Sequence, residues 1–116
     1  MDTLTLAPAP SATVAVTVEL LLMPDESGQV VAYCPALELS SYGDDEVEAR
    51  AAFTEALELT LEASHERGTL DQWLLALGWR ICKKPFPAYD PPRLPLEILN
   101  QPRQRILPLL IALPTV

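Results

Sequence analysis

The alternation of apolar and polar residues predicts three strands in the first third of the chain. In residues 13–22 (TVAVTVELLL), valines alternate with small or polar residues, which is the period of a strand with one buried face. The Pro, Asp, Ser and Gly residues of 23–28 predict a hairpin loop, after which residues 29–34 continue as a second strand. Pro35 lacks an N–H group and should end that strand, so that residues 37–42 form a third. Together these segments predict an antiparallel meander.

A long amphipathic helix is predicted next, from about Glu46 to Arg67. Asp45, with Glu48 three residues later, resembles a capping box, and Gly68 is placed to end the helix in the left-handed conformation. Small and apolar residues recur every three or four positions, in a stripe wide enough to cover one face of a sheet. They are Ala49, Ala52, Phe53, Ala56, Leu57, Thr60 and Leu61, and the opposite face carries Glu48, Glu55, Glu58, Glu62 and Glu66.

The last third of the chain predicts a short helix, a strand and a proline-rich arm. A second capping box, Thr69 with Gln72, predicts a helix over 70–77 that Gly78 ends. Residues 79–83 (WRICK) alternate and predict a fourth strand. After Lys84 the prolines favour extended backbone, with room for one helical turn over 96–101. Residues 105–116 are apolar, and Pro108 and Pro114 confine them to the edge of a sheet, either on their own domain or on a partner chain.

One α+β domain with two extensions is the resulting prediction. A chain of 116 residues is long enough for one compact domain. We expect an extended lead-in over 1–12, the domain over 13–84, and a proline-rich arm with an apolar C-terminal segment over 85–116. The domain should contain an antiparallel sheet of about four strands, with the long helix on one face. The short helix is the second helix of the domain.

Charge and composition narrow the classes of partner. The net charge is −8, and most of the acids lie in residues 37–71, while the segment from Trp79 onward is locally positive. An acidic body repels phosphate backbones, so direct DNA binding is not expected, whereas a basic protein partner suits it. The alternative is that the acids only solvate one helix face. There is no apolar run of membrane-spanning length and no secretory signal pattern, so we expect a cytoplasmic protein with Cys34 and Cys82 as reduced thiols.

Residues 30–70 (VVAYCPALELSSYGDDEVEARAAFTEALELTLEASHERGTL) resemble the HicB-like antitoxin domain. The family's features occur in the same order here. They are a strand ending in an aromatic residue and proline, a polar turn and strand, an acidic helix start, and a long helix that ends at a glycine. Residues 68–84 (GTLDQWLLALGWRICKK) resemble the continuation of small HicB-like proteins, so that the likeness covers about residues 14–84. The matching residues are Tyr33, Pro35, Leu37, Gly43, Asp44, Glu48, Ala49, Phe53, Ala56, Leu57 and Gly68.

The resemblance implies a partial RNase H-like fold and an antitoxin that binds and blocks a small toxin that cleaves messenger RNA. Two departures accompany it. Residues 36–41 (ALELSS) stand where the family commonly carries a Pro-Gly-Cys-like segment. The prolines after Lys84 leave no room for the helix-turn-helix or ribbon-helix-helix module of many members.

Catalytic chemistry is not expected, and neither a cofactor nor a bound metal is predicted. His65 is the single histidine, and a solvated helical position explains it better than cation binding with Glu62 and Glu66. Asp44, Asp45 and Glu48 cluster, but they are first of all helix caps. A divalent-metal nuclease remains a third hypothesis, although the predicted strands add only Glu19 and Glu38 to these carboxylates.

Protein binding is the function that the sequence favours. The expected partner is a small basic toxin-like protein, which this chain would neutralise by occlusion, with a homodimer as the expected assembly. The alternative is a homo-oligomeric structural or adaptor module that exchanges its C-terminal arm between subunits. For Trp73 and Trp79, the alternative to binding a partner is that both side chains pack against the sheet in the core. The candidate contact residues are Trp73, Trp79, Glu55, Glu62, Ile106, Leu109 and Ile111.

Overall fold

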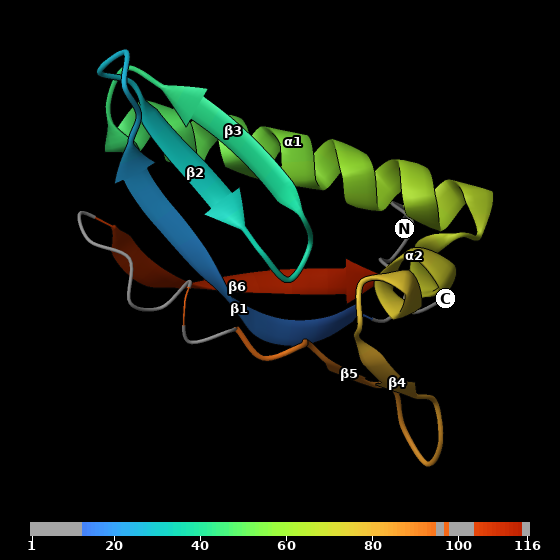
Figure 1. Cartoon of the computed structure of the whole chain (residues 1–116). Coiled ribbons are helices and arrows are strands. Elements are labelled where there is room, and N and C mark those ends of the chain that lie inside the picture. Colours follow the sequence, from blue (N-terminus) through green and yellow to red (C-terminus); the bar gives the residue numbers. More distant parts are fainter. Residues whose placement is uncertain (1–12, 95–96, 98–103, 115–116) are drawn as a thin grey trace, which may run out of the picture.

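The computed structural model describes residues 13–94, 97 and 104–114 of the chain. It is an α+β fold with one four-stranded antiparallel sheet, a long helix across one face, a short second helix, and a separate two-stranded ribbon (Figure 1). The elements are β1 (Thr13–Pro24), β2 (Val30–Cys34), β3 (Leu39–Gly43), α1 (Glu46–Arg67), α2 (Leu70–Ala76), β4 (Arg80–Cys82), β5 (Ala88–Asp90) and β6 (Arg105–Pro114). Among the described residues, no helix is long and apolar enough to cross a membrane.

The predicted meander of three strands is confirmed. Residues 21–24 of β1 pair with 30–33 of β2, and residues 30–34 of β2 pair with 39–43 of β3, all antiparallel. The hairpin loop between β1 and β2 is closed by Asp25, whose carboxylate accepts hydrogen bonds from the N–H groups of Ser27 and Gln29. The Ser27 hydroxyl donates to the same carboxylate and, with these N–H groups, lowers the pKa of Asp25.

The fourth strand of the sheet is the C-terminal segment, and the prediction that residues 79–83 supply it is wrong. The sheet order is β3-β2-β1-β6, while β4 pairs with β5 in the separate ribbon. Residues 105–114 of β6 pair with 13–22 of β1, and the predicted edge position of this proline-containing segment is confirmed. Because Ile111 and Leu113 of β6 are 4% and 0% exposed, the segment after Lys84 includes a strand of the domain itself.

α1 lies across one face of the sheet, as its pattern predicts. The Asp45 carboxylate accepts a hydrogen bond from the Glu48 N–H at 2.8 Å, and the Glu48 carboxylate accepts from the Asp44 N–H, also at 2.8 Å. At the other end Gly68 adopts a φ of 70°, which a left-handed helix stop requires. The buried stripe consists of Ala49, Phe53, Leu57 and Leu61, and it faces Val16, Val18, Leu20 and Leu22 of β1 in one core.

The short helix α2 forms where it is predicted, but Thr69 does not cap it. The Thr69 hydroxyl donates instead to the Ser64 carbonyl at 3.4 Å, because Thr69 follows the tight Gly68 turn and has no extended N-cap backbone. Gly78, with a φ of 98°, ends the helix. The chain then enters the core at Trp79, whose indole N–H donates to the Ala36 carbonyl at 2.7 Å. This hydrogen bond joins the end of α2 to the β2–β3 turn.

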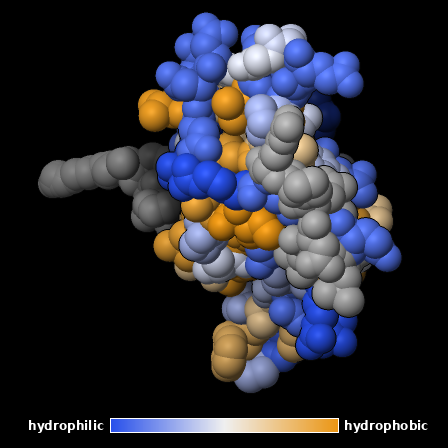
Figure 2. Space-filling view, turned by 60° about the vertical axis from the view of Figure 1, so that its left-hand side comes forward, coloured by the Kyte–Doolittle hydropathy of each residue, from blue (hydrophilic) through white to orange (hydrophobic). Residues whose placement is uncertain are grey.

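Hydrophobic side chains reach the surface in the middle of one face, between hydrophilic regions above and below (Figure 2). Among the described residues of β6, the exposed large hydrophobic ones are Ile106 and Leu110. The other exposed large hydrophobic residues among those described are Tyr42, Val47, Leu59, Leu75 and Phe86. The predicted lead-in over 1–12 lies outside the described residues, as does the helical turn predicted over 96–101 apart from residue 97.

Gly43 sets how closely β3 approaches α1. A Cβ atom at Gly43 would lie 2.6 Å from the Ala49 nitrogen and 2.7 Å from the Glu48 Cβ atom. These are atoms of the first helical turn, and they cannot move without breaking the cap. Glycine is therefore required here for its small volume rather than for its backbone freedom.

We expect Gly43→Ala to lower the free energy of unfolding by about 1–3 kcal/mol, the usual cost of overpacking a core. Urea unfolding followed by circular dichroism measures this change. Ser40→Ala is the matched control, because Ser40 is exposed on the same strand and its replacement should cost less than about 0.5 kcal/mol. Equal stability of Gly43→Ala and the unmodified protein would contradict the close approach.

Candidate functional site

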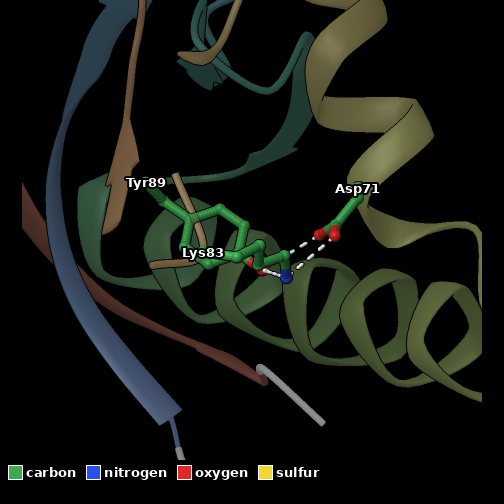
Figure 3. Close-up of polar contacts among 3 residues, drawn as sticks. All are labelled: Asp71, Lys83 and Tyr89. Atoms are coloured by element: carbon green, nitrogen blue, oxygen red, sulfur yellow. Dashed lines mark hydrogen bonds and ion pairs between the residues drawn. The ribbon is translucent and has the colours of Figure 1, made fainter. Parts of the chain in front are cut away.

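One cluster of polar side chains joins three elements at the edge of the core. The polar cluster, defined as Asp71, Lys83 and Tyr89, brings together the first turn of α2, the residue after β4 and the middle of β5 (Figure 3). The Lys83 ammonium donates to the Tyr89 hydroxyl at 2.6 Å and lies 2.9 Å from the Asp71 carboxylate. The Tyr89 hydroxyl donates to the same carboxylate at 2.9 Å. The three groups therefore satisfy one another in a closed ring.

Local structure explains why these three side chains meet. Tyr89 is buried, and β5 pairs with β4 through Ile81↔Tyr89, which places the tyrosine ring against the core beneath α2. Lys83 continues from β4, and its ammonium lies 5.0 Å from the centroid of the Tyr89 ring, within the range of a cation–π contact. Asp71 opens α2, where a negative charge near the helix N-terminus is favourable.

The ionisation states of the polar cluster are those of a structural ion pair. Burial opposes the charge of Asp71, but hydrogen bonds from Lys83 and Tyr89 lower its pKa below the usual value. Hydrogen bonding to Tyr89 and Asp71 raises the pKa of Lys83, and burial raises the pKa of Tyr89. Near neutral pH, Asp71 is thus held in its negative form, Lys83 in its positive form and Tyr89 in its uncharged form. A general acid or base needs a pKa shifted toward neutrality instead. The cluster acts as a clamp on the β4–β5 ribbon.

A small cavity of about 180 Å³ lies beside the polar cluster. His65, Gly68, Leu70 and Pro114 complete its wall together with the three cluster residues. The side chain of His65 is half-buried, and none of the hydrogen bonds found among the described residues involves it. The sequence did not identify this site, because Asp71, Lys83 and Tyr89 are far apart in the chain and follow no shared spacing.

The carboxylates considered as metal ligands do not converge. Within residues 13–94, 97 and 104–114, no group of three or more His, Cys, Asp or Glu side chains is close enough to hold a metal ion. Asp45 and Glu48 are used as the two halves of the α1 cap. Cys34 is buried and Cys82 is exposed, so the two thiols do not pair, and burial raises the pKa of Cys34.

The predicted contact residues are spread over three environments. Trp79 and Ile111 are core residues at 2% and 4% exposure, so neither side chain is accessible to a partner. Trp73 and Leu109 are half-buried and pack against the core. Glu55, Glu62 and Ile106 are exposed, the glutamates on α1 and Ile106 on β6. The structure therefore places the exposed members of this set on two surfaces, on opposite sides of the sheet. The other members lie in the core or pack against it.

The exposed glutamates belong to an uninterrupted stripe on α1. The acidic face, defined as Glu55, Glu58, Glu62 and Glu66, runs along the side of the helix opposite to Phe53 and Leu57, and all four side chains are exposed. In the described part of the chain, none of the ion pairs involves any of the four. Among the described acids of α1, Glu46 forms an ion pair, and its partner is Arg105 at the start of β6.

Comparison of the chain with models of protein families, with curated proteins and with solved structures finds no match. A function for the chain must therefore be inferred from its own surfaces. The polar cluster has a structural role as a clamp, whereas the side chains of the acidic face form no ion pair with any other described residue.

We expect Asp71→Asn to lower the free energy of unfolding at neutral pH by about 0.5–1 kcal/mol, a modest value because the paired side chains are 47% and 42% exposed. The pKa of Asp71 is lowered in the folded state, so its contribution is present above the unfolded pKa of about 3.9 and is lost as pH falls through the folded value. Urea unfolding of both proteins should therefore give curves that differ at pH 7 and converge toward pH 3.

Asp90→Asn is the control for this measurement. Asp90 pairs with Arg80 on the same ribbon at 3.5 Å, but both side chains are largely exposed, at 67% and 86%. Its loss should change stability by less than about 0.5 kcal/mol at pH 7. A difference between Asp71→Asn and the unmodified protein that does not depend on pH would show that charge is not the cause.

Proposed function

We propose that the chain is a protein-binding, antitoxin-like module that acts in the cytoplasm and uses the acidic face of α1 to dock on a small basic protein. The observation that carries the proposal is the stripe of four exposed glutamates, none of which forms an ion pair with another described residue. Its mechanism would be occlusion, in which a rigid helix covers the basic surface that the partner uses on RNA. The resemblance of residues 14–84 to HicB-like antitoxins supports the same class of partner.

The acidic face is costly to the folded chain by itself. Neighbouring side chains on a helix are three or four residues apart, and no lysine or arginine stands at these distances from Glu55, Glu58, Glu62 or Glu66. Two pairs at a spacing of four, Glu58 with Glu62 and Glu62 with Glu66, bring like charges together. Each such pair destabilises a helix by about 0.2–0.5 kcal/mol. A surface that only solvated the helix would gain stability from mixed charges, so a basic partner is the better explanation.

The position of the acidic face suits a docking surface. α1 is packed through its buried stripe and held at both ends by its cap and by Gly68, so it is a rigid element. Leu59 is 61% exposed on the same side of the helix and offers an apolar contact within the charged stripe. Binding to a preformed helix avoids the cost of ordering its backbone, which favours a fast and charge-steered encounter.

Strand exchange between subunits is the alternative. β1 is the neighbour of β6 in the sheet, and a long segment separates β6 from β5. The ten residue pairs between β1 and β6 could therefore form between two copies of the chain as well as within one. Removal of all residues after Lys84 would not test this idea, because it would take Ile111 and Leu113 out of the core. A dimer of this kind would leave the exposed faces of the sheet unused.

We expect Glu62→Gln to raise the free energy of unfolding of the isolated chain by about 0.4–1 kcal/mol, because it removes both like-charge pairs at the spacing of four. Thermal or urea unfolding at low ionic strength measures the gain, which salt should reduce. Glu26→Gln is the control, since Glu26 is exposed in the β1–β2 loop and not in a helix. A loss of stability in Glu62→Gln would contradict the view that the stripe is costly.

The same stripe should be required for binding. The partner to test is a small basic protein encoded by a gene next to that of this chain, and isothermal titration calorimetry with both purified proteins measures the binding. Glu58→Gln/Glu62→Gln should weaken binding roughly 2- to 30-fold, since an exposed ion pair contributes about 0.2–1 kcal/mol. Glu26→Gln/Glu38→Gln removes the same charge from exposed positions outside the helix and should bind almost normally. Equal loss in both variants, or no binding by the unmodified chain, would overturn the proposal.

A further inference from the structure

The two edge strands of the sheet differ in how they are protected against a further strand. In the order β3-β2-β1-β6, the edge strands are β3 and β6, and Figure 1 shows β3 at one margin of the sheet with β2 beside it. Exposed edges are commonly blunted by prolines or charged side chains. β6 contains Pro108 and Pro114, whereas β3 (LSSYG) contains neither a proline nor a charged residue.

The register shows which residues of β2 direct their backbone groups toward β3. The Asp25 N–H donates to the Gln29 carbonyl at 2.8 Å, which makes these two residues a hydrogen-bonded pair where the β1–β2 ladder ends. Hydrogen-bonded pairs alternate along an antiparallel ladder. Val31 and Tyr33 are therefore the residues of β2 that bond to β1, and the residues between and beside them bond to β3.

On β3, the backbone groups of Ser40 and Tyr42 face away from the sheet. These residues stand opposite Tyr33 and Val31, so they occupy the pairs of the β2–β3 ladder that exchange no hydrogen bonds. Among the described residues, no hydrogen bond outside the strand pairing involves either of them. The β3 edge, defined as the N–H and C=O groups of Ser40 and Tyr42, therefore offers two donors and two acceptors to an added strand.

The same alternation explains where the prolines of β6 stand. Odd-numbered residues of β1 lie opposite Val31 and Tyr33 and bond to β2, so the even-numbered ones bond to β6. Their partners on β6 are odd-numbered, which leaves the even-numbered residues of β6, Pro108 and Pro114 among them, facing outward. The β6 edge thus lacks N–H groups where an added strand needs them, and β3 is the edge suited to pairing.

Acidic side chains stand at both ends of the β3 edge. Glu38 precedes β3 and Asp44 follows it, and both are exposed. Opposite charges on paired strands attract each other. A strand with a basic residue at each end would therefore bring a positive charge to Glu38 and another to Asp44. The exposed ring of Tyr42 between these acids adds a surface on which neighbouring side chains of such a strand can pack.

A second copy of β3 is disfavoured as the occupant. Two β3 strands paired about a two-fold axis at Ser41 would set Ser40 opposite Tyr42, which uses the outward groups of both copies. The same register sets Glu38 of each copy opposite Asp44 of the other. Like charges directly opposite each other destabilise a strand pair, and here they would meet at both ends. The charges favour a foreign strand with basic ends.

We propose that the β3 edge binds an extended segment of a basic protein as a fifth strand of the sheet, with basic residues opposite Glu38 and Asp44. Backbone hydrogen bonds to an exposed strand edge are a general way of holding an extended peptide. The choice of a basic partner rests on the proposed function, and strand addition is the further step that says how a segment of that partner docks.

Amide hydrogen exchange, followed by NMR on the unmodified chain, tests the proposal with a synthetic peptide. The probe is a capped peptide Lys-Thr-Val-Thr-Val-Thr-Lys, which matches the span from Glu38 to Asp44. At saturating peptide, exchange of the Ser40 and Tyr42 N–H groups should slow by about tenfold or more, because both become hydrogen-bonded. The Ser41 N–H, already bonded to β2, should change little. The same peptide with Glu at both ends should bind roughly fourfold more weakly or worse.

Ser40→Pro is the variant to test, because it removes an outward N–H group and leaves the hydrogen bonds between β2 and β3 in place. It should weaken binding of the basic peptide by roughly 2- to 10-fold. Ser40→Ala is the matched control, since it retains the N–H group and should bind normally. Circular dichroism checks that both variants fold, and the exchange measurement on the unmodified chain decides the question if Ser40→Pro does not.

Three results would overturn the proposal. The first is absence of binding, or binding that leaves exchange at Ser40 and Tyr42 unchanged. The second is equal binding of the basic and acidic peptides. The third is slower exchange at these two N–H groups as the concentration of the chain alone rises, which would make a second copy the occupant. Glu58→Gln/Glu62→Gln should bind the peptide almost normally, so failure of strand addition and failure of docking through the acidic face are distinguished.

Discussion

The pairing of β1 with β6 is the constraint on which the rest of the structure depends. It joins the first described strand to the last one over ten consecutive residue pairs, and it places Ile111 and Leu113 in the core beside β1. Closing so long a loop costs chain entropy, which the burial of apolar side chains from both strands offsets. Because no residue is skipped, the pairing also decides which side chains face α1 and which face outward. Both the core and the outward face of the sheet follow from this register.

The polar cluster gives three reactive residue types a structural role. The β4–β5 ribbon has only three residues in each strand, too few for stability by backbone pairing. Tyr89 gives it a buried anchor, and the ring of hydrogen bonds with Lys83 and Asp71 ties it to α2. The pKa shifts of the three groups point away from neutral pH, because each partner favours the ordinary state of the others.

The sheet divides the molecule into two faces of different chemistry. On one side α1 turns toward the solvent four glutamates that form no ion pair with another described residue, and on the other β1 and β6 present Ala15, Thr17 and Ala112 around Leu110. Charge excludes a second copy from the first face and steers basic proteins to it.

Local features of this fold were predictable from the sequence because they depend on neighbouring residues. Alternation in residues 13–34 marked two strands, Asp45 and Gly68 marked the ends of α1, and spacing marked its buried stripe. The sequence could not decide which segment completes the sheet, since strand pairing depends on contacts between distant residues and several segments alternate equally well. Only the tertiary structure placed β6 beside β1 and left residues 79–83 mostly to a separate ribbon. It also buried Trp79 under the β2–β3 turn and brought Asp71 to Tyr89, because burial is a property of the assembled layers and not of any one segment.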